Sequence, residues 1–129
     1  MIFHVVLFAP RPDLTPGEEA AFAAALAQAV REIPTIRSAR VGRLVNNGQA
    51  YKARASADFP YAAILEFDDL AGLQAYLAHP AHQALGARFH DTLRAALVFD
   101  YDMDEVASIG AWLDAARTHP ANSPLGSDS

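Results

Sequence analysis

The sequence predicts an α+β domain with the element order β-α-β-β-α-β, and three observations support that prediction. The chain has 129 residues and no cysteine, so it is long enough for one domain that folds without disulfides. Apolar runs of strand length occupy residues 2–9, 61–67 and 96–101. The segments between them contain apolar residues at steps of three or four, which is the spacing of amphipathic helices.

The first helix, over residues 16–32, has the clearest local signals. Thr15 precedes Pro16, and Glu18 follows Thr15 by three residues, which is the pattern of a capping box. A proline at position 34 ends the helix, because the residue before a proline disfavours helical backbone angles. One apolar stripe runs along this helix and consists of Phe22, Leu26 and Val30.

The middle of the chain is predicted to hold two strands. Residues 36–46 contain valines with arginines between them, which indicates a half-exposed strand, and Asn46-Asn47-Gly48 indicates a turn. Residues 49–58 are small and polar and predict a loop or flap. Side chains alternate along a strand, so in strand 61–67 four residues should share one face: Tyr61, Ala63, Leu65 and Phe67.

Two helices are predicted before the last strand. Asp68 or Asp69 can cap the first, and His79-Pro80 ends it. The second is expected over residues 81–95, with its inward side chains at His82, Leu85, Phe89 and Leu93. Beyond the last strand we expect the domain to end at residue 103. An amphipathic helical extension over 104–119 and a flexible tail over 120–129 should follow.

This element order is the ferredoxin-like arrangement, a four-stranded antiparallel sheet with helices on one face. Both faces of strand 2–9 are nonetheless apolar. His4, Val6 and Phe8 share one face with Ile2, whereas the other face carries Phe3, Val5 and Leu7. Helices can cover only one of these faces, so a second subunit should cover the other. We therefore expect a homodimer with sheet-to-sheet packing.

Charge and motif content exclude several classes of function. Ten Lys and Arg stand against 15 Asp and Glu, a net charge of −5, which does not suit binding to a nucleic-acid backbone. No apolar run reaches the ~20 residues of a membrane helix, and the start is not that of a signal peptide, so we expect a cytoplasmic protein. Phosphate-binding glycine loops and serine-hydrolase motifs are missing from the sequence.

Several motifs in sequence order resemble the stress-responsive α/β barrel (Dabb) family over about residues 2–101. They are H-V-V-L-F from His4, E-F-D-D-L from Glu66, A-Y-L-A-H-P-A-H from Ala75 and V-F-D-Y from Val98. The resemblance implies a dimeric α/β barrel made from two four-stranded sheets. Most members of the family have no assigned activity, and one plant member closes a linear polyketide by aldol condensation.

The resemblance to that plant cyclase implies a catalytic set of His4, Tyr76 and His82, all present here. In this interpretation His82 is the base and Tyr76 donates to the developing enolate. His4 is either an orienting group or a second group that carries a proton. His79 supports the helix break by bonding a free carbonyl. No metal or cofactor is needed. The pocket for a small apolar or aromatic ligand would be lined by Phe22, Leu85, Arg88 and Phe89.

Two functions from different classes follow. The first is a dimeric protein of undefined activity that binds a small molecule or serves as a scaffold. The second is a cofactor-independent, polyketide-cyclase-like enzyme. In a third interpretation, the histidines and Tyr76 are ordinary core residues. A zinc site made from His79, His82 and His90 is disfavoured, because a proline interrupts the His pair and no carboxylate has ligand spacing.

Overall fold

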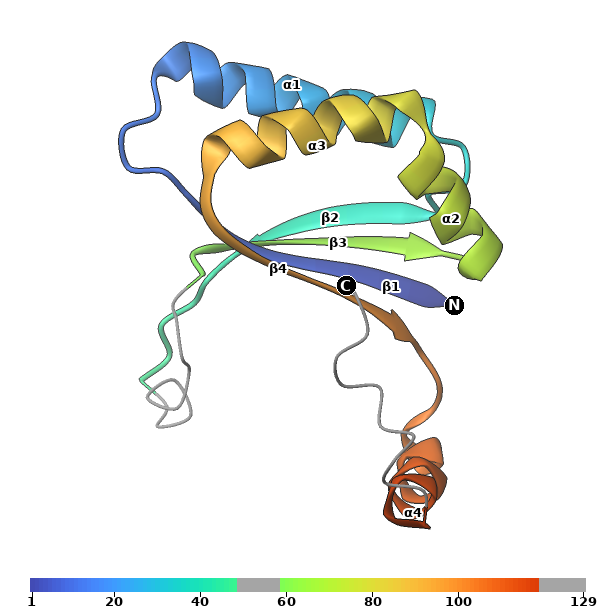
Figure 1. Cartoon of the computed structure of the whole chain (residues 1–129). Coiled ribbons are helices and arrows are strands. Elements are labelled where there is room, and N and C mark those ends of the chain that lie inside the picture. The colour runs from blue at the N-terminus through green and yellow to red at the C-terminus, as the bar shows by residue number, and fades with distance from the viewer. Residues whose placement is uncertain (49–58, 119–129) are drawn as a thin grey trace.

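A four-stranded antiparallel sheet, covered by helices on one face, forms the body of the chain (Figure 1). The computed structural model describes residues 1–48 and 59–118. The expected ferredoxin-like order is confirmed. Its elements are β1 (Ile2–Pro10), α1 (Pro16–Glu32), β2 (Ser38–Arg43), β3 (Tyr61–Phe67), α2 (Leu70–Ala78), α3 (Pro80–Thr92) and β4 (Leu93–Asp102), followed by the 3₁₀ turn η2 (Val106–Ser108) and the helix α4 (Ile109–Thr118).

The strand order β2-β3-β1-β4 places β1 in the interior of the sheet, between β3 and β4. Both pairings are antiparallel, so Val6 lies opposite Ala63 on one side and Val98 on the other. Helices α1 and α3 lie side by side above the sheet, and α2 lies at the end where β1 begins (Figure 1). This arrangement brings residues from the two ends of the domain onto neighbouring strands.

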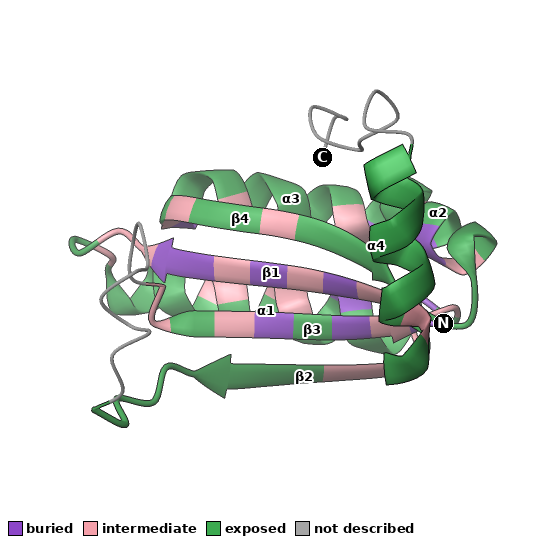
Figure 2. Ribbon diagram, turned by 90° about the horizontal axis from the view of Figure 1, so that it is seen from below, coloured by how far each residue is buried: buried purple, intermediate pink, exposed green. Residues whose placement is uncertain are grey.

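The core lies between the sheet and the helices. His4, Val6 and Phe8 share one face of β1, as predicted, and this is the face that is buried; alternate residues of β3 join them (Figure 2). Phe67 is fully buried at the end of β3, whereas Tyr61 at its start is exposed. From the helices, the largest buried side chains are Leu73, Tyr76 and Leu85.

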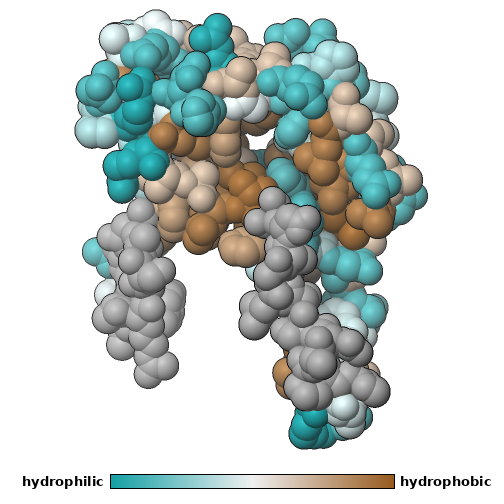
Figure 3. Space-filling model, in the orientation of Figure 1, coloured by the Kyte–Doolittle hydropathy of each residue, from teal (hydrophilic) through white to brown (hydrophobic). Residues whose placement is uncertain are grey.

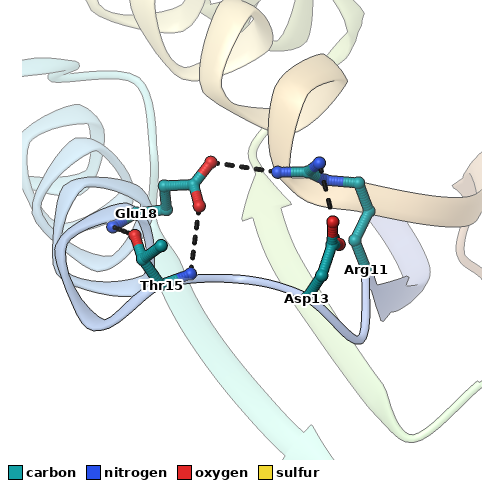
Figure 4. Close-up of polar contacts among 4 residues, drawn as sticks. All are labelled: Arg11, Asp13, Thr15 and Glu18. Carbon is teal, nitrogen blue, oxygen red and sulfur yellow. Dashed lines mark hydrogen bonds and ion pairs between the residues drawn. The ribbon is translucent and has the colours of Figure 1, made fainter.

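The predicted capping box at the start of α1 is present (Figure 4). The Glu18 backbone N–H donates to the Thr15 hydroxyl oxygen at 3.1 Å, and the Thr15 N–H donates to a Glu18 carboxylate oxygen at 3.0 Å. Arg11 donates to the other Glu18 oxygen at 3.0 Å and lies 3.7 Å from Asp13. The bond from the Thr15 backbone is the largest cause that lowers the pKa of Glu18 below its ordinary value.

Several element boundaries differ from the sequence-based expectation. β2 covers only 38–43, not 36–46. The helix predicted to reach residue 95 ends at Thr92, and Leu93 belongs to β4 because it pairs with Pro10 of β1. The C-terminal helix begins at Ile109 rather than near Asp104. The loop expected at 49–58 and the tail at 120–129 lie outside the described residues.

The face of the sheet opposite α1 and α3 carries apolar side chains from three strands. Half-buried Phe3, Val5 and Leu7 come from β1, and exposed residues flank them: Ile64 of β3, with Leu97, Phe99 and Tyr101 of β4. No helix within the described ranges has both the length and the apolarity required to cross a bilayer.

We predict that Thr15→Ala lowers the free energy of unfolding by about 1 kcal/mol, because the hydroxyl oxygen that accepts the Glu18 backbone N–H at the N-terminus of α1 is lost. Urea unfolding followed by circular dichroism measures this change. Thr15→Ser should restore most of the loss. Thr118→Ala provides the control, since among the described residues the Thr118 hydroxyl donates only to carbonyls of its own helix. An equal loss in the Ser and Ala variants at position 15 would show that the hydroxyl bond is not the cause.

Candidate functional site

The break between α2 and α3 consists of one residue, His79. Its backbone is extended, which lets the chain turn before Pro80 starts the next helix. The His79 Nδ1 accepts a hydrogen bond from the Ala81 backbone N–H at 3.0 Å. We expected His79 to bond a carbonyl at the end of the preceding helix, and that detail is wrong. The N-terminus of α3 presents unsatisfied N–H groups, so the ring is needed as an acceptor.

His4 and Asp100 meet across the β1–β4 pairing. They lie directly opposite each other in the register, and the His4 Nδ1 is 2.6 Å from an Asp100 carboxylate oxygen. His4 is 5% exposed, whereas the Asp100 side chain is 39% exposed. A carboxylate can only accept, so Nδ1 carries the proton and donates it. Nε2 of a neutral His4 is then the unprotonated nitrogen.

Tyr76 lies between the two histidines that the sequence analysis grouped with it. Its ring centroid is 5.4 Å from that of His4 and 4.6 Å from that of His82. The residue is 3% exposed. Burial, together with the negative charge of Asp100, raises the pKa of Tyr76 to about 12. The hydroxyl therefore stays protonated at neutral pH and can serve as a hydrogen-bond donor.

His82 is held by the last turn of α2. Its Nδ1 lies 3.1 Å from the Leu77 carbonyl oxygen, and a carbonyl only accepts, so Nδ1 donates. Burial lowers the pKa of His82 below its ordinary value; the bond to Leu77 opposes this shift and the nearby His4 adds to it. A neutral His82 therefore presents an unprotonated Nε2, which is the form that a general base requires.

These groups line one cavity of about 360 Å³ between the sheet and the helices. His4, Tyr76, His82 and Asp100 supply its polar groups, and most of the remaining wall is apolar. The space-filling view shows hollows below the helix layer, with apolar side chains gathered beside them (Figure 3). A volume of this size, with few polar groups converging in it, is typical of a small-molecule site.

The predicted pocket residues divide into two groups. Phe22, Leu85 and Phe89 line the cavity. Arg88 does not belong to its lining and is exposed, because it precedes Phe89 on α3 and falls on the solvent side of that helix. A larger cavity of about 470 Å³, towards Arg43 and Tyr61, contains no histidine among its lining residues.

Asp100 is the site residue that the sequence analysis did not identify. It belongs to the V-F-D-Y segment, which marks the last strand. Only the pairing of that strand with β1 reveals that Asp100 faces His4. A predicted antiparallel register between the first and last strands would have identified Asp100 from the sequence. In the part of the chain that the structure describes, no three His, Asp or Glu residues lie close enough to hold a metal ion.

Comparison with known proteins supports the fold. A dimeric ferredoxin-like protein of unknown function from Jannaschia sp. CCS1 is 27% identical, with a TM-score of 0.62, over 79% of this chain and 98% of that one. A Dabb family protein from Mesorhizobium loti is 22% identical, with a TM-score of 0.63, over 81% and 97% of the two chains.

A hydroxynitrile lyase from Passiflora edulis shares the fold at 16% identity, with a TM-score of 0.68, over 81% of this chain and 94% of that one. No curated protein matches the sequence. The model of the stress responsive A/B barrel domain, Dabb, matches residues 2–103. With the fold and the motifs in agreement, the chain belongs to the stress responsive A/B barrel domain (Dabb) family.

Proposed function

We propose that this chain forms a homodimer that binds a small, largely apolar molecule in the cavity between the sheet and α2–α3. The cavity itself is the observation on which the proposal depends. Its walls are apolar except where Asp100, His4, Tyr76 and His82 come together. A fitting ligand therefore has an aliphatic or aromatic body and one carbonyl or hydroxyl group, directed at the histidines.

The open face of the sheet supports the homodimer. Apolar side chains from β1, β3 and β4 form a continuous surface there, and Leu97, Phe99 and Tyr101 remain between 41% and 51% exposed. A contiguous apolar surface of this kind is typical of an interface. The relative from Jannaschia is described as dimeric. Two copies that place these faces together would bury both surfaces.

We predict that Phe99→Asp converts the dimer into a monomer, because it places a charge at the centre of the proposed interface, beside Val5. Light scattering coupled to size exclusion measures the mass. Ala87→Asp, at an exposed position of α3, is the control and should remain dimeric. A Phe99→Asp protein that keeps the dimer mass would contradict sheet-to-sheet packing.

Gly86 offers a direct test of ligand binding. It lines the cavity, and a Cβ added there meets no atom within 4 Å apart from its chain neighbours and the backbone of its own helix. Gly86→Leu should therefore fill the cavity while the fold is retained, since replacing a helical glycine also removes a conformational cost of about 1 kcal/mol. The control is Ala87→Leu at the adjacent exposed position, which does not line the cavity.

We predict that phenols and polyketide-like acids raise the melting temperature of the wild type and of Ala87→Leu, but not of Gly86→Leu. A ligand at 100 times its Kd stabilises a fold by about 2.7 kcal/mol, which is easily measured by thermal unfolding. A shift that persists in Gly86→Leu would place the ligand elsewhere. A wild type that responds to no compound of either class would contradict the proposed ligand chemistry.

A second candidate function, cofactor-free proton transfer, is favoured by the bond between His4 and Asp100. A buried imidazole with one nitrogen fixed by a carboxylate keeps a defined orientation and tautomer. In this scheme the Nε2 of His82 removes a proton next to a substrate carbonyl, and the Tyr76 hydroxyl donates a hydrogen bond to the enolate oxygen. His4 returns or relays the proton. A protein with this fold carries the name hydroxynitrile lyase.

We predict that the protein catalyses exchange of the α-protons of an aryl-substituted ketone, phenylacetone, for deuterium in D₂O; NMR measures the exchange. Exchange requires neutral His82. Its pKa is lowered, so the rate should be constant at neutral pH and fall only in acid, below the ordinary histidine pKa of about 6.5. Deprotonation of Tyr76 should not lower the rate until the pH approaches its pKa of about 12.

His82→Asn is the informative variant, because the Asn amide can keep the donor to the Leu77 carbonyl while Nε2 is lost. We expect the exchange rate to fall about 100-fold or more. Asp100→Asn should lower the rate without weakening the binding of the ketone. Exchange that is equally fast in His82→Asn and wild type would exclude this role and leave ligand binding as the function.

A further inference from the structure

Helix α4 and the turn before it carry an apolar stripe that no described part of the chain buries. Val106 of the preceding turn is 88% exposed, and none of the residues of α4 is buried. The stripe consists of Val106, Ile109, Trp112, Leu113 and Ala116, which recur at helical spacing. The polar residues Asp114 and Arg117, which form an ion pair with each other, lie to one side of the stripe. An exposed stripe of this kind requires a partner surface.

The position of α4 limits what that partner can be. The helix lies on the opposite side of the sheet from α1 and α3, at the end where β1 begins and β4 ends (Figures 1 and 2). Residues 103–105 connect β4 to the 3₁₀ turn η2, which leads directly into α4, and three residues span at most about 11 Å. The Met103 N–H also donates to the Met1 carbonyl at 2.9 Å, which ties this connection to the start of β1. The apolar stripe therefore begins, at Val106, within about 11 Å of the end of β4.

A second sheet packed on the open face would occupy the space beside the start of this stripe, because packed sheets lie about 10 Å apart. A stripe that begins there, on the open-face side of the sheet, starts beside the sheet of a second copy. The strand that precedes it belongs to the same face, since β4 carries Leu97, Phe99 and Tyr101 on the open face and is followed by the stripe after residues 103–105.

We propose that α4 clasps a second copy of this chain, with its apolar stripe packed against the partner subunit at the margin of the paired sheets. The inference rests on the homodimer proposed above and adds an interface element to it. The element lies beyond residues 2–103, which the family model covers. In a two-fold dimer the clasp occurs twice, so a substitution in the stripe weakens both contacts.

Trp112 provides a direct measurement, because it is the only tryptophan of the chain and lies in the stripe, 49% exposed in one copy. Fluorescence emission and acrylamide quenching of the full chain are measured across a dilution series, and the mass is measured in parallel by sedimentation. We expect blue-shifted emission and slow quenching in the dimer. Both should revert to solvent-exposed values as the protein dissociates on dilution.

A matched pair of variants tests the stripe. Leu113→Asp places a charge in it, whereas Ala111→Asp places the same charge on the opposite side of α4. We expect Leu113→Asp to raise the dimer Kd about tenfold or more and to speed the quenching of Trp112. Ala111→Asp should leave both quantities within about twofold of wild type.

The outcomes separate this inference from the homodimer itself. A protein that is monomeric at every concentration overturns both. A dimer in which Trp112 is quenched as fast as in the urea-unfolded chain overturns the clasp and leaves the dimer in place. Slow quenching that persists in the monomeric Phe99→Asp protein shows that α4 packs on its own chain, which also overturns the clasp.

Discussion

The antiparallel pairing of β1 with β4 is the constraint on which the rest of this molecule depends. It joins the first and last strands of the domain and sets His4 directly opposite Asp100. The same register places Val98 opposite Val6 beneath the helices. It also carries Leu97 and Phe99 to the open face, because side chains alternate along a strand. A shift of one residue would exchange these two sets and remove both the core and the site.

The break at His79 is the second constraint, and it acts through the backbone. Pro80 prevents α2 from continuing, so the chain starts a new helix whose first N–H groups need acceptors. The His79 ring supplies one at Ala81. The Leu77 carbonyl, freed at the end of α2, accepts from the His82 ring instead of from a helical N–H. The helix break thereby orients the imidazole that faces the cavity and sets its tautomer.

Burial has opposite consequences for the two titratable groups on the helices. It lowers the pKa of His82 and raises that of Tyr76, since each group is driven towards its neutral form. A neutral imidazole beside a protonated phenol combines a proton acceptor with a hydrogen-bond donor. That combination suits a ligand with a carbonyl or hydroxyl group, whether the protein only binds it or also moves a proton.

The sequence by itself determined the element order, the capping box at Thr15 and which residues share each face of β1, because these depend on local backbone chemistry and on side-chain periodicity. The resemblance to a family also grouped His4, Tyr76 and His82, which line one cavity in the structure.

Tertiary structure decided the features that depend on pairing between distant segments. Leu93 belongs to β4 and not to the predicted helix, because it pairs with β1. Asp100 lies at the site because β4 pairs with β1, and Arg88 does not line the cavity because it lies on the exposed side of α3. Periodicity identifies the face of an element but not the neighbour that the face meets, and that neighbour is chosen only when the sheet assembles.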